Sequence, residues 1–257
     1  MHVNNVLLFL FLNFSNLILS CQSLCNILLS NYTLPIYNDG TTYNDDALQL
    51  ALSDCKSQGG GKITIPAGKY LLSPFNLTSN IELHLERDCI LLASTDHSKW
   101  NIVESLPSYP KDPNGGRVGA FISGCNISNV SITGYGTIDG QGIAWWEVDG
   151  LLYGRPRLIE PMYCNNFKMI NITIMNPAFW AIHPYACNDL LFENIIYSAP
   201  INSPNTDGID PDSCSYVIIR NFTTLSCGDD AIAIKSGKDA EGRAFGKPSH
   251  HILIEGI

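Results

Sequence analysis

Short runs of alternating apolar and polar residues recur along most of the chain. Four of them begin at a cysteine, and "SHHILIEGI" from Ser249 continues the series. The four are "CNISNVSITG" from Cys125, "CNNFKMINITIMN" from Cys164, "CNDLLFENIIYS" from Cys187 and "CSYVIIRNFTTLS" from Cys214. Alternation on β-branched residues predicts strands rather than helices. The successive starts lie 39, 23, 27 and 35 residues apart. A repeat in the low twenties with insertions at its turns is typical of a parallel β-helix.

One segment follows a helical pattern instead. In "NDDALQLALSDCKSQGGG" we predict a helix over residues 45–57, with Asn44 as its N-cap and the glycines from Gly59 to Gly61 ending it. A helix there would cover the open end of a β-helix, which otherwise exposes a strand edge and an apolar interior. The runs "GGKITIPAGKYLL" and "IELHLERDCILLAS" are then the first strands. We therefore predict an all-β fold over residues 24–257: one right-handed parallel β-helix with an N-terminal capping helix.

The first 23 residues form a separate segment. Their apolar stretch from Val6 to Leu19 is short for a membrane span and has the length of a signal-peptide core. We predict a secretory signal that is cleaved after Ser23, with a signal anchor as the alternative. Secretion is compatible with disulfides among the eight remaining cysteines, although the sequence does not give their pairing. It also predicts a glycoprotein, with sequons at Asn31, Asn76, Asn126, Asn129, Asn171 and Asn221.

Aligned on their starts, the repeats place four cysteines in one column: Cys125, Cys164, Cys187 and Cys214. Strands of neighbouring coils lie about 4.8 Å apart with their side chains parallel, which suits disulfide geometry poorly. We predict that this column is a stack of buried thiols.

Composition narrows the possible functions. The chain has 15 Lys+Arg against 24 Asp+Glu, a net charge of −9, and no basic run, which excludes a nucleic-acid partner. A hydrophobic content of 45% with 15% charged residues indicates a folded domain rather than a disordered chain. We expect no stable membrane association and a monomer.

Two acidic stretches interrupt the strand pattern. "NSPNTDGIDPDSC" holds three aspartates within six positions, and "CGDDAIAIKSG" holds the adjacent pair Asp229 and Asp230. When "FWAIHPYAC" is aligned with "TDGIDPDSC" on the Pro-x-x-Cys ends, Trp180 stacks on Asp207. The next coil then brings Asp230 over Asp207, with Asp229 beside them. We predict that these three carboxylates share one outward face.

Such crowding has a chemical consequence. Two carboxylates ~5 Å apart at an effective dielectric constant near 20 repel by roughly 3 kcal/mol, or about two pKa units. One of the three groups should then hold a proton, which gives an acid and a base side by side, as glycoside hydrolysis requires. A calcium site is the alternative, since hard oxygen ligands suit that ion. "DGIDPD" lacks the spaced loop and terminal Glu of an EF-hand, and we predict no metal and no cofactor.

The two acidic motifs together resemble those of glycoside hydrolase family 28, the polygalacturonases and related pectin hydrolases. The likeness extends from "DDALQLAL" and "GGGKITIPAGKYLL" through "GYGTIDGQGIAWW" to the double aspartate. The resemblance implies that Asp229 is the general acid, that Asp207 and Asp230 activate the attacking water, and that the reaction inverts the anomeric centre. The general spacing rule would instead assign retention to carboxylates this close. The resemblance also implies a pectic polysaccharide substrate and a location outside the cell or in the cell wall.

Four further residues are candidates for binding the substrate: Asn205, Asp210, His183 and Lys235. Lys235 would meet a substrate carboxylate, with a solvated side chain as the alternative. His183 stacks on Asp210 in the same alignment, and a structural Asp–His pair is its alternative. Trp180 is either a platform for a sugar ring or a packing residue.

The chain departs from the family at its end. Members of the family carry a Gly-His-Gly-like segment about one coil after the double aspartate and an Arg-Ile-Lys segment later, and this chain ends at Ile257 before either. His250 and His251 do not match these motifs. We therefore expect a fragment with weak or no activity. The alternative functions are a β-helix that binds pectin without cleaving it and, as a lesser rival, a calcium-dependent pectate lyase.

Overall fold

The computed structural model describes residues 25–148 and 150–257, so the predicted signal segment lies outside the described residues. The strands are β1 (Cys25–Leu28), β2 (Asp39–Tyr43), β3 (Gly61–Ile65), β4 (Gly68–Leu72), β5 (Phe75–Asn76), β6 (Ile81–Leu85), β7 (Cys89–Ala93), β8 (Ile102–Val103), β9 (Arg117–Val118), β10 (Ile122–Cys125), β11 (Ser128–Gly134), β12 (Thr137–Asp139), β13 (Ile159–Met162), β14 (Asn165–Ile170), β15 (Thr173–Met175), β16 (Asn188–Ser198), β17 (Ser215–Ser226) and β18 (His250–Glu255). The helices are α1 (Asp45–Ser57), α2 (Ile143–Trp146) and α3 (Asp239–Phe245), with short 3-10 turns at Leu29–Asn31 and His97–Lys99.

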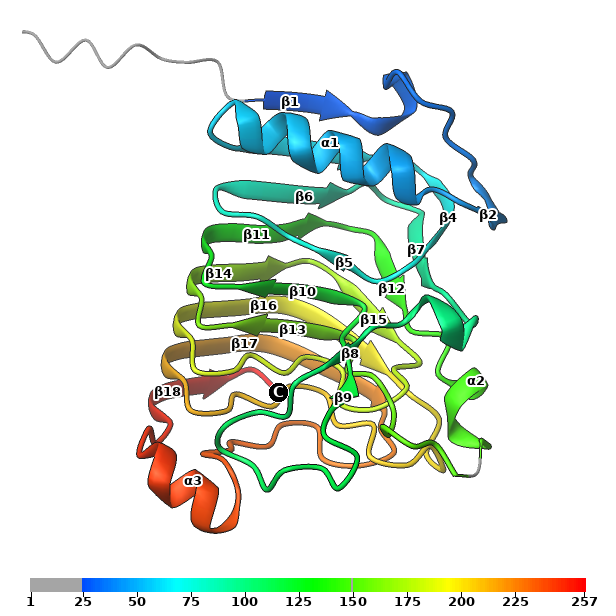
Figure 1. The fold of residues 1–257 in the computed structure, drawn as a ribbon. Helices are drawn as coiled ribbons and strands as arrows, with labels where there is room; N and C mark the ends of the chain where they lie inside the picture. The colour runs from blue at the N-terminus through cyan, green and yellow to red at the C-terminus, as the bar shows by residue number, and fades with distance from the viewer. Residues whose placement is uncertain (1–24, 149) are drawn as a thin grey trace, which may run out of the picture.

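The strands form stacked coils, as predicted (Figure 1). Within the described residues every strand pair is parallel except β8 with β9. One face runs β1-β3-β6-β11-β14, and a second runs β2-β4-β7-β12-β15; the longer β16 and β17 continue both. A third face is the sheet β5-β10-β13. The predicted parallel β-helix is confirmed.

The third face continues beyond β13 through single bridged pairs of residues. Ile159 pairs with Ile182, Ile182 with Ile209, and Ile209 with Ile232, all in parallel. This is the alignment expected from the Pro-x-x-Cys ends. Ile182 and Ile209 are fully buried in the apolar interior between the faces. The residues that flank these isoleucines on the same coils are the acidic motifs.

Helix α1 has the predicted bounds and covers the N-terminal end of the coils (Figure 1). Its apolar side, including Ala51 and Cys55, is buried in the core, and a disulfide joins Cys55 to Cys25 of β1. Asn44 is at the N-cap position, as predicted, but its side chain makes no capping bond, because it bonds to the backbone of Tyr37 and Thr42 instead. One prediction here was wrong. Strands β1 and β2 precede the expected first strands.

The column of thiols is shorter than predicted. Cys164, Cys187 and Cys214 are buried on successive coils, and each Sγ of the latter two accepts a backbone N–H of the cysteine before it. Cys125 lies outside this column. The register that pairs Cys125 with Met162 brings Ile127 over Cys164, so the expected alignment was wrong by two residues. Cys125 is exposed.

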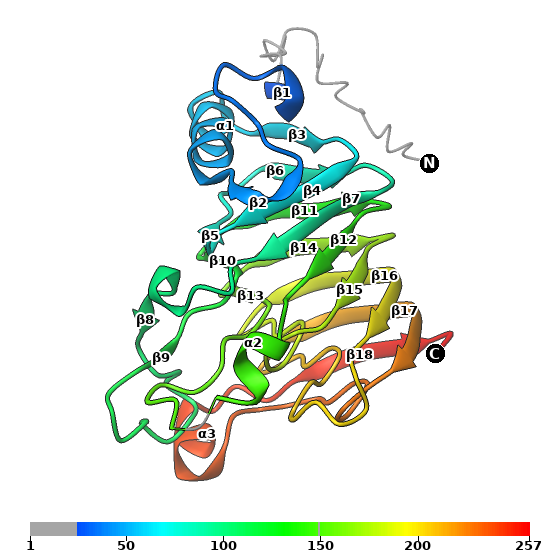
Figure 2. The same cartoon turned by 90° about the vertical axis from the view of Figure 1, so that its right-hand side faces the viewer.

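Two insertions lie beside the third face (Figure 2). The segment between β7 and β10 carries β8 and β9, and its Tyr109 hydroxyl donates to Asp212 at 2.6 Å. From α3, the Phe245 ring stacks on Tyr185 with ring centroids 5.7 Å apart. These contacts shield part of the face from solvent. Among the described residues, no helix has the length and apolar character that a membrane crossing requires.

Candidate active site

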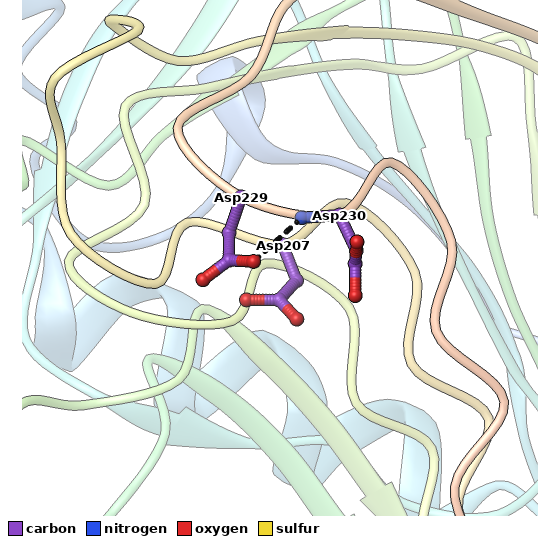
Figure 3. Close-up of side chains that lie close together, drawn as sticks. All are labelled: Asp207, Asp229 and Asp230. Carbon is purple, nitrogen blue, oxygen red and sulfur yellow. Dashed lines mark hydrogen bonds between the residues drawn. The ribbon is translucent and has the colours of Figure 1, made fainter.

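Asp207, Asp229 and Asp230 come together at the third face (Figure 3). One carboxylate oxygen from each lies within 4.8 Å of those of the other two. Asp207 precedes the bridged Ile209, while Asp229 and Asp230 precede Ile232 on the next coil. Asp207 is only 3% exposed, whereas the other two are exposed. The predicted convergence of the three carboxylates on one face is confirmed.

Glycines beside the aspartates allow the two coils to approach this closely. A Cβ on Gly228 would lie 2.0 Å from the Ser203 carbonyl oxygen, and one on Gly208 would lie 2.4 Å from that of Ala231. Neither distance leaves room for any side chain, so both positions require glycine. In the motifs "TDG" and "CGDD", each aspartate of the cluster therefore lies close to a glycine that lets the coils approach one another.

Lys235 is the cation closest to the buried member of the group. Its Nζ lies 3.4 Å from Asp207 Oδ2, 3.4 Å from Asp210 Oδ1, and 4.3 Å from the centre of the Trp180 ring. Burial raises the pKa of Asp207, Lys235 opposes this, and the charge of Asp229 adds to it. Burial and the charge of Asp207 raise the pKa of Asp210 to about 8 despite Lys235. Burial is thus the larger cause of the raised pKa of both aspartates, and the charge of a neighbouring carboxylate adds to it.

Behind these residues lies a buried row of ionisable side chains. His183 is fully buried between two carboxylates, with Nδ1 2.9 Å from Glu160 Oε1 and Nε2 3.4 Å from Asp212 Oδ2. Glu160 also forms ion pairs with Arg117 at 2.8 Å and with Arg157 at 3.3 Å. Burial would raise the pKa of Glu160, but these cations outweigh it and lower the pKa to about 2.

Asp212 is at the other end of this row, on the far side of His183 from Glu160. Its Oδ1 accepts the backbone N–H of Gly237 at 2.8 Å, and its Oδ2 accepts the Tyr109 hydroxyl. Burial acts to raise the pKa of Asp212, but the hydrogen bonds from His183 and Tyr109 lower it overall. The buried carboxylates are therefore held ionised by fixed donors, and they tie the coils to the covering segment.

This arrangement corrects two expectations about substrate binding. His183 and Asp210 are both 0% exposed, so neither side chain is placed to touch a ligand at the surface. Their columns point away from the apolar interior, as expected, but side chains of neighbouring coils lie against them: Glu160 and Asp212 flank His183, and Lys235 lies beside Asp210. The structural alternative for His183 also needs correction, because its carboxylate partners are Glu160 and Asp212 rather than Asp210. Asn205 is exposed and Lys235 partly exposed, so both remain available to a substrate.

Sequence reasoning missed the coil before these motifs. The bridge from Ile159 to Ile182 extends the alignment to "YGRPRLIEP", which places Arg157 over Trp180 and Glu160 over His183. Arg155 falls in the column of Asn205. Extending the Pro-x-x-Cys alignment upstream by one coil would have shown these residues. The contact with Tyr109 had no such signal, because it comes from an insertion.

The cluster can act as an acid and a base, or it can bind a cation. Three carboxylates at this spacing suit the oxygen ligands that Ca²⁺ prefers. Lys235, however, already places a positive charge against Asp207. The cluster combines a buried carboxyl, whose pKa is raised by burial, with two exposed ones, so its members lie in different environments, as a site with an acid and a base requires.

Comparisons with known proteins agree with this geometry. The family model described as glycosyl hydrolases family 28 matches residues 55–252. A "Probable polygalacturonase" of Vitis vinifera is 44% identical over 225 residues, which are 84% of this chain and 46% of that protein. An "Exopolygalacturonase" of Zea mays is 33% identical over 77% of this chain and 47% of its own length. The chain thus spans about half the length of the curated relatives it matches.

Solved structures share the fold. The exopolygalacturonase from Thermotoga maritima superposes with a TM-score of 0.76 at 28% identity, covering 88% of this chain and 58% of the other. The polygalacturonase from Erwinia carotovora gives 0.69 at 25% identity, covering 88% and 64%. The family match and the acidic motifs at the third face lead to the same conclusion. The chain belongs to glycosyl hydrolases family 28.

Proposed function

We propose that this chain carries the catalytic centre of a polygalacturonase-type glycoside hydrolase, which cleaves the galacturonan backbone of pectin. The observation that carries the proposal is the convergence of Asp207, Asp229 and Asp230 within 4.8 Å on one face. The relatives named polygalacturonase and exopolygalacturonase support the substrate class. Secretion, glycosylation and a place in the extracellular space or cell wall belong to the same proposal.

The proposed roles of the three carboxyls follow the resemblance of their two motifs to those of the family. Asp229 donates its proton to the glycosidic oxygen as the bond from that oxygen to the anomeric carbon breaks. A water attacks the anomeric carbon from the opposite face of the ring. It loses its proton to the general base, which is formed by Asp207 and Asp230 together. The product is then inverted at that carbon. We expect an acidic pH optimum, because Asp229 must carry a proton while the carboxylates of the general base are ionised.

The substrate carries a carboxylate on every ring, and the net charge of −9 opposes its approach. Local cations must therefore meet it. Lys235 is partly exposed beside Asp207, and its ammonium also lies over Trp180. We propose that Lys235 and Asn205 contact the sugar next to the scissile bond.

The test compares two proteins: the 257-residue chain and a form extended to the length of the relatives. Release of reducing ends from polygalacturonic acid measures hydrolysis, and proton NMR of the first product measures its anomeric configuration. We expect hydrolysis with inversion by at least one form. Retention would refute the roles assigned here, and binding without release of ends by both forms would establish a pectin-binding protein instead.

A matched control separates hydrolysis from metal-dependent chemistry. Hydrolysis is measured with EDTA and with added CaCl₂, and absorbance in the ultraviolet reports unsaturated products. We expect EDTA to leave the rate unchanged and the absorbance to stay flat. Loss of activity in EDTA with restoration by calcium would favour the cation site, and unsaturated products would indicate a lyase.

A further inference from the structure

Arg155 joins three segments of chain beside the cluster. Its Nη1 donates to the carbonyl oxygens of Ala178, at 2.8 Å, and Pro204, and its Nη2 donates to Asn205 Oδ1 at 2.8 Å. The guanidinium also lies 5.0 Å from the centre of the Phe179 ring. Three of its five N–H groups are thus directed at neighbouring coils, in a fork that a lysine cannot reproduce.

This fork determines which way the Asn205 amide faces. An arginine only donates, so the oxygen of Asn205 must face Arg155 and the NH₂ group must face the other way. There, Asn205 Nδ2 lies 3.3 Å from Asp229 Oδ2. The second oxygen, Asp229 Oδ1, accepts the backbone N–H of Asp230 at 3.0 Å (Figure 3). Both oxygens of Asp229 are therefore held, one of them through Asn205.

Asn205 would not hold this orientation alone. Its side chain is exposed, and the terminal torsion of an asparagine is broad, with two nearly equivalent amide orientations. Its backbone has φ of 52°, a conformation that asparagine tolerates and most residues do not. The loop thus presents the amide next to Asp229, and a partner that can only donate is needed to orient it.

We propose that Arg155 is a positioning residue: by anchoring Asn205, it holds the Asp229 carboxyl in place to protonate the glycosidic oxygen. This role rests on the proposed function of Asp229. It predicts an effect on the chemical step rather than on binding, because Arg155 acts through Asn205. A displacement of about 1 Å at a reacting group can lower the rate by about 10²-fold.

Kinetics test the proposal in the form that hydrolyses polygalacturonate. We expect Arg155→Ala to lower kcat by about 10- to 100-fold with little change in KM. Asn205→Gly, which keeps the backbone conformation, should lower kcat at least as much, and the double variant should lose no more than Asn205→Gly alone. Arg155→Lys should restore only part of the rate. Arg220→Ala is the control, because Arg220 also bridges coils, to Glu255, but on the exposed surface.

NMR supplies a readout that needs no turnover. The side-chain amide signal of Asn205 is identified by its loss in Asn205→Gly, and the carboxyl carbon of Asp229 by its loss in Asp229→Asn. We expect Arg155→Ala to shift both signals and Arg220→Ala to shift neither. Unshifted signals, a loss confined to KM, or additive losses in the double variant would overturn the proposal. If the wild type binds but does not hydrolyse, the function fails, while the two signals still decide whether Arg155 holds this contact.

Discussion

Two groups of carboxylates lie along the third face, on different coils, and differ in what surrounds them. Asp229 and Asp230 are exposed at the face, whereas Asp212 and Glu160 are buried behind it. His183 lies between the buried pair. Glu160 also pairs with Arg117 and Arg157, and Asp212 accepts from Tyr109 and the Gly237 backbone. The exposed pair faces solvent, and among the described residues Asp229 accepts only from Asn205 and the Asp230 backbone.

The comparison separates residues that do chemistry from residues that hold the coils. A buried carboxylate with a full set of donors is fixed in its ionised form and cannot exchange protons with a substrate. An exposed carboxylate beside another can. Asp207 and Asp210 lie between the two groups, since both are buried but share only Lys235 as a cation partner. Their raised pKa values reflect that position.

Replacement of the proposed acid should have the largest effect. We expect Asp229→Asn to lower kcat by about 10²–10⁴-fold, the usual contribution of a general acid, with little change in thermal unfolding because the side chain is exposed. Reducing-end release at saturating polygalacturonate measures the loss. Asp189→Asn, on the surface of β16, is the matched control. Hydrolysis that survives in Asp229→Asn would assign the acid role to another residue.

Breaking the buried group should affect folding instead. Glu160→Gln leaves Arg117, Arg157 and His183 without their shared anion, and loss of a buried partner costs about 3–5 kcal/mol of unfolding free energy. Urea denaturation measures the difference. Glu193→Gln is the control, because its pair with Arg220 is on the surface at 3.9 Å and should contribute less than about 1 kcal/mol. Equal effects of the two variants would remove the distinction between the groups.

Repeating columns explain how much of this the sequence could predict. The alignment of Ile182, Ile209 and Ile232 was readable because each coil places one apolar residue inward, and it brought Asp207 and Asp230 together. Burial was not readable, because it depends on side chains of other coils, such as Glu160, and on an insertion with no counterpart in neighbouring coils. His183 therefore looked like a surface ligand. The same cause left Tyr109 unnoticed.

Lys235 sets the environment of the base, so its replacement should shift a pH profile. Lys235 lowers the pKa of Asp207, against burial, and its loss lets that pKa rise further. We expect Lys235→Gln to move the acidic limb of kcat/KM to higher pH, since this limb reports ionisation of the base in the free enzyme. Lys247→Gln, whose Nζ donates to the Ala186 carbonyl oxygen, is the control. An acidic limb that stays in place would show that another ionisation sets it.

The last comparison concerns two neighbouring aspartates and their influence on stability at different pH. The pKa of Asp210 is raised to about 8 in the folded chain, against about 3.9 when unfolded, so the folded state binds more protons between these values. Its contribution to stability therefore falls as pH rises from about 4 to 8. Asp210→Asn keeps the group neutral and should match the wild type near pH 4 and unfold at a higher temperature near pH 8.

Asp212 should behave in the opposite way. Its pKa is lowered by His183 and Tyr109 in spite of burial, so the stability it contributes is present at neutral pH and is lost as pH falls through the acidic range. Asp212→Asn should destabilise the chain at pH 7 and approach the wild type as pH falls. Melting curves of both variants from pH 4 to 8 check the signs. Slopes of the same sign would mean that burial alone, rather than the donors that each carboxylate faces, governs this part of the molecule.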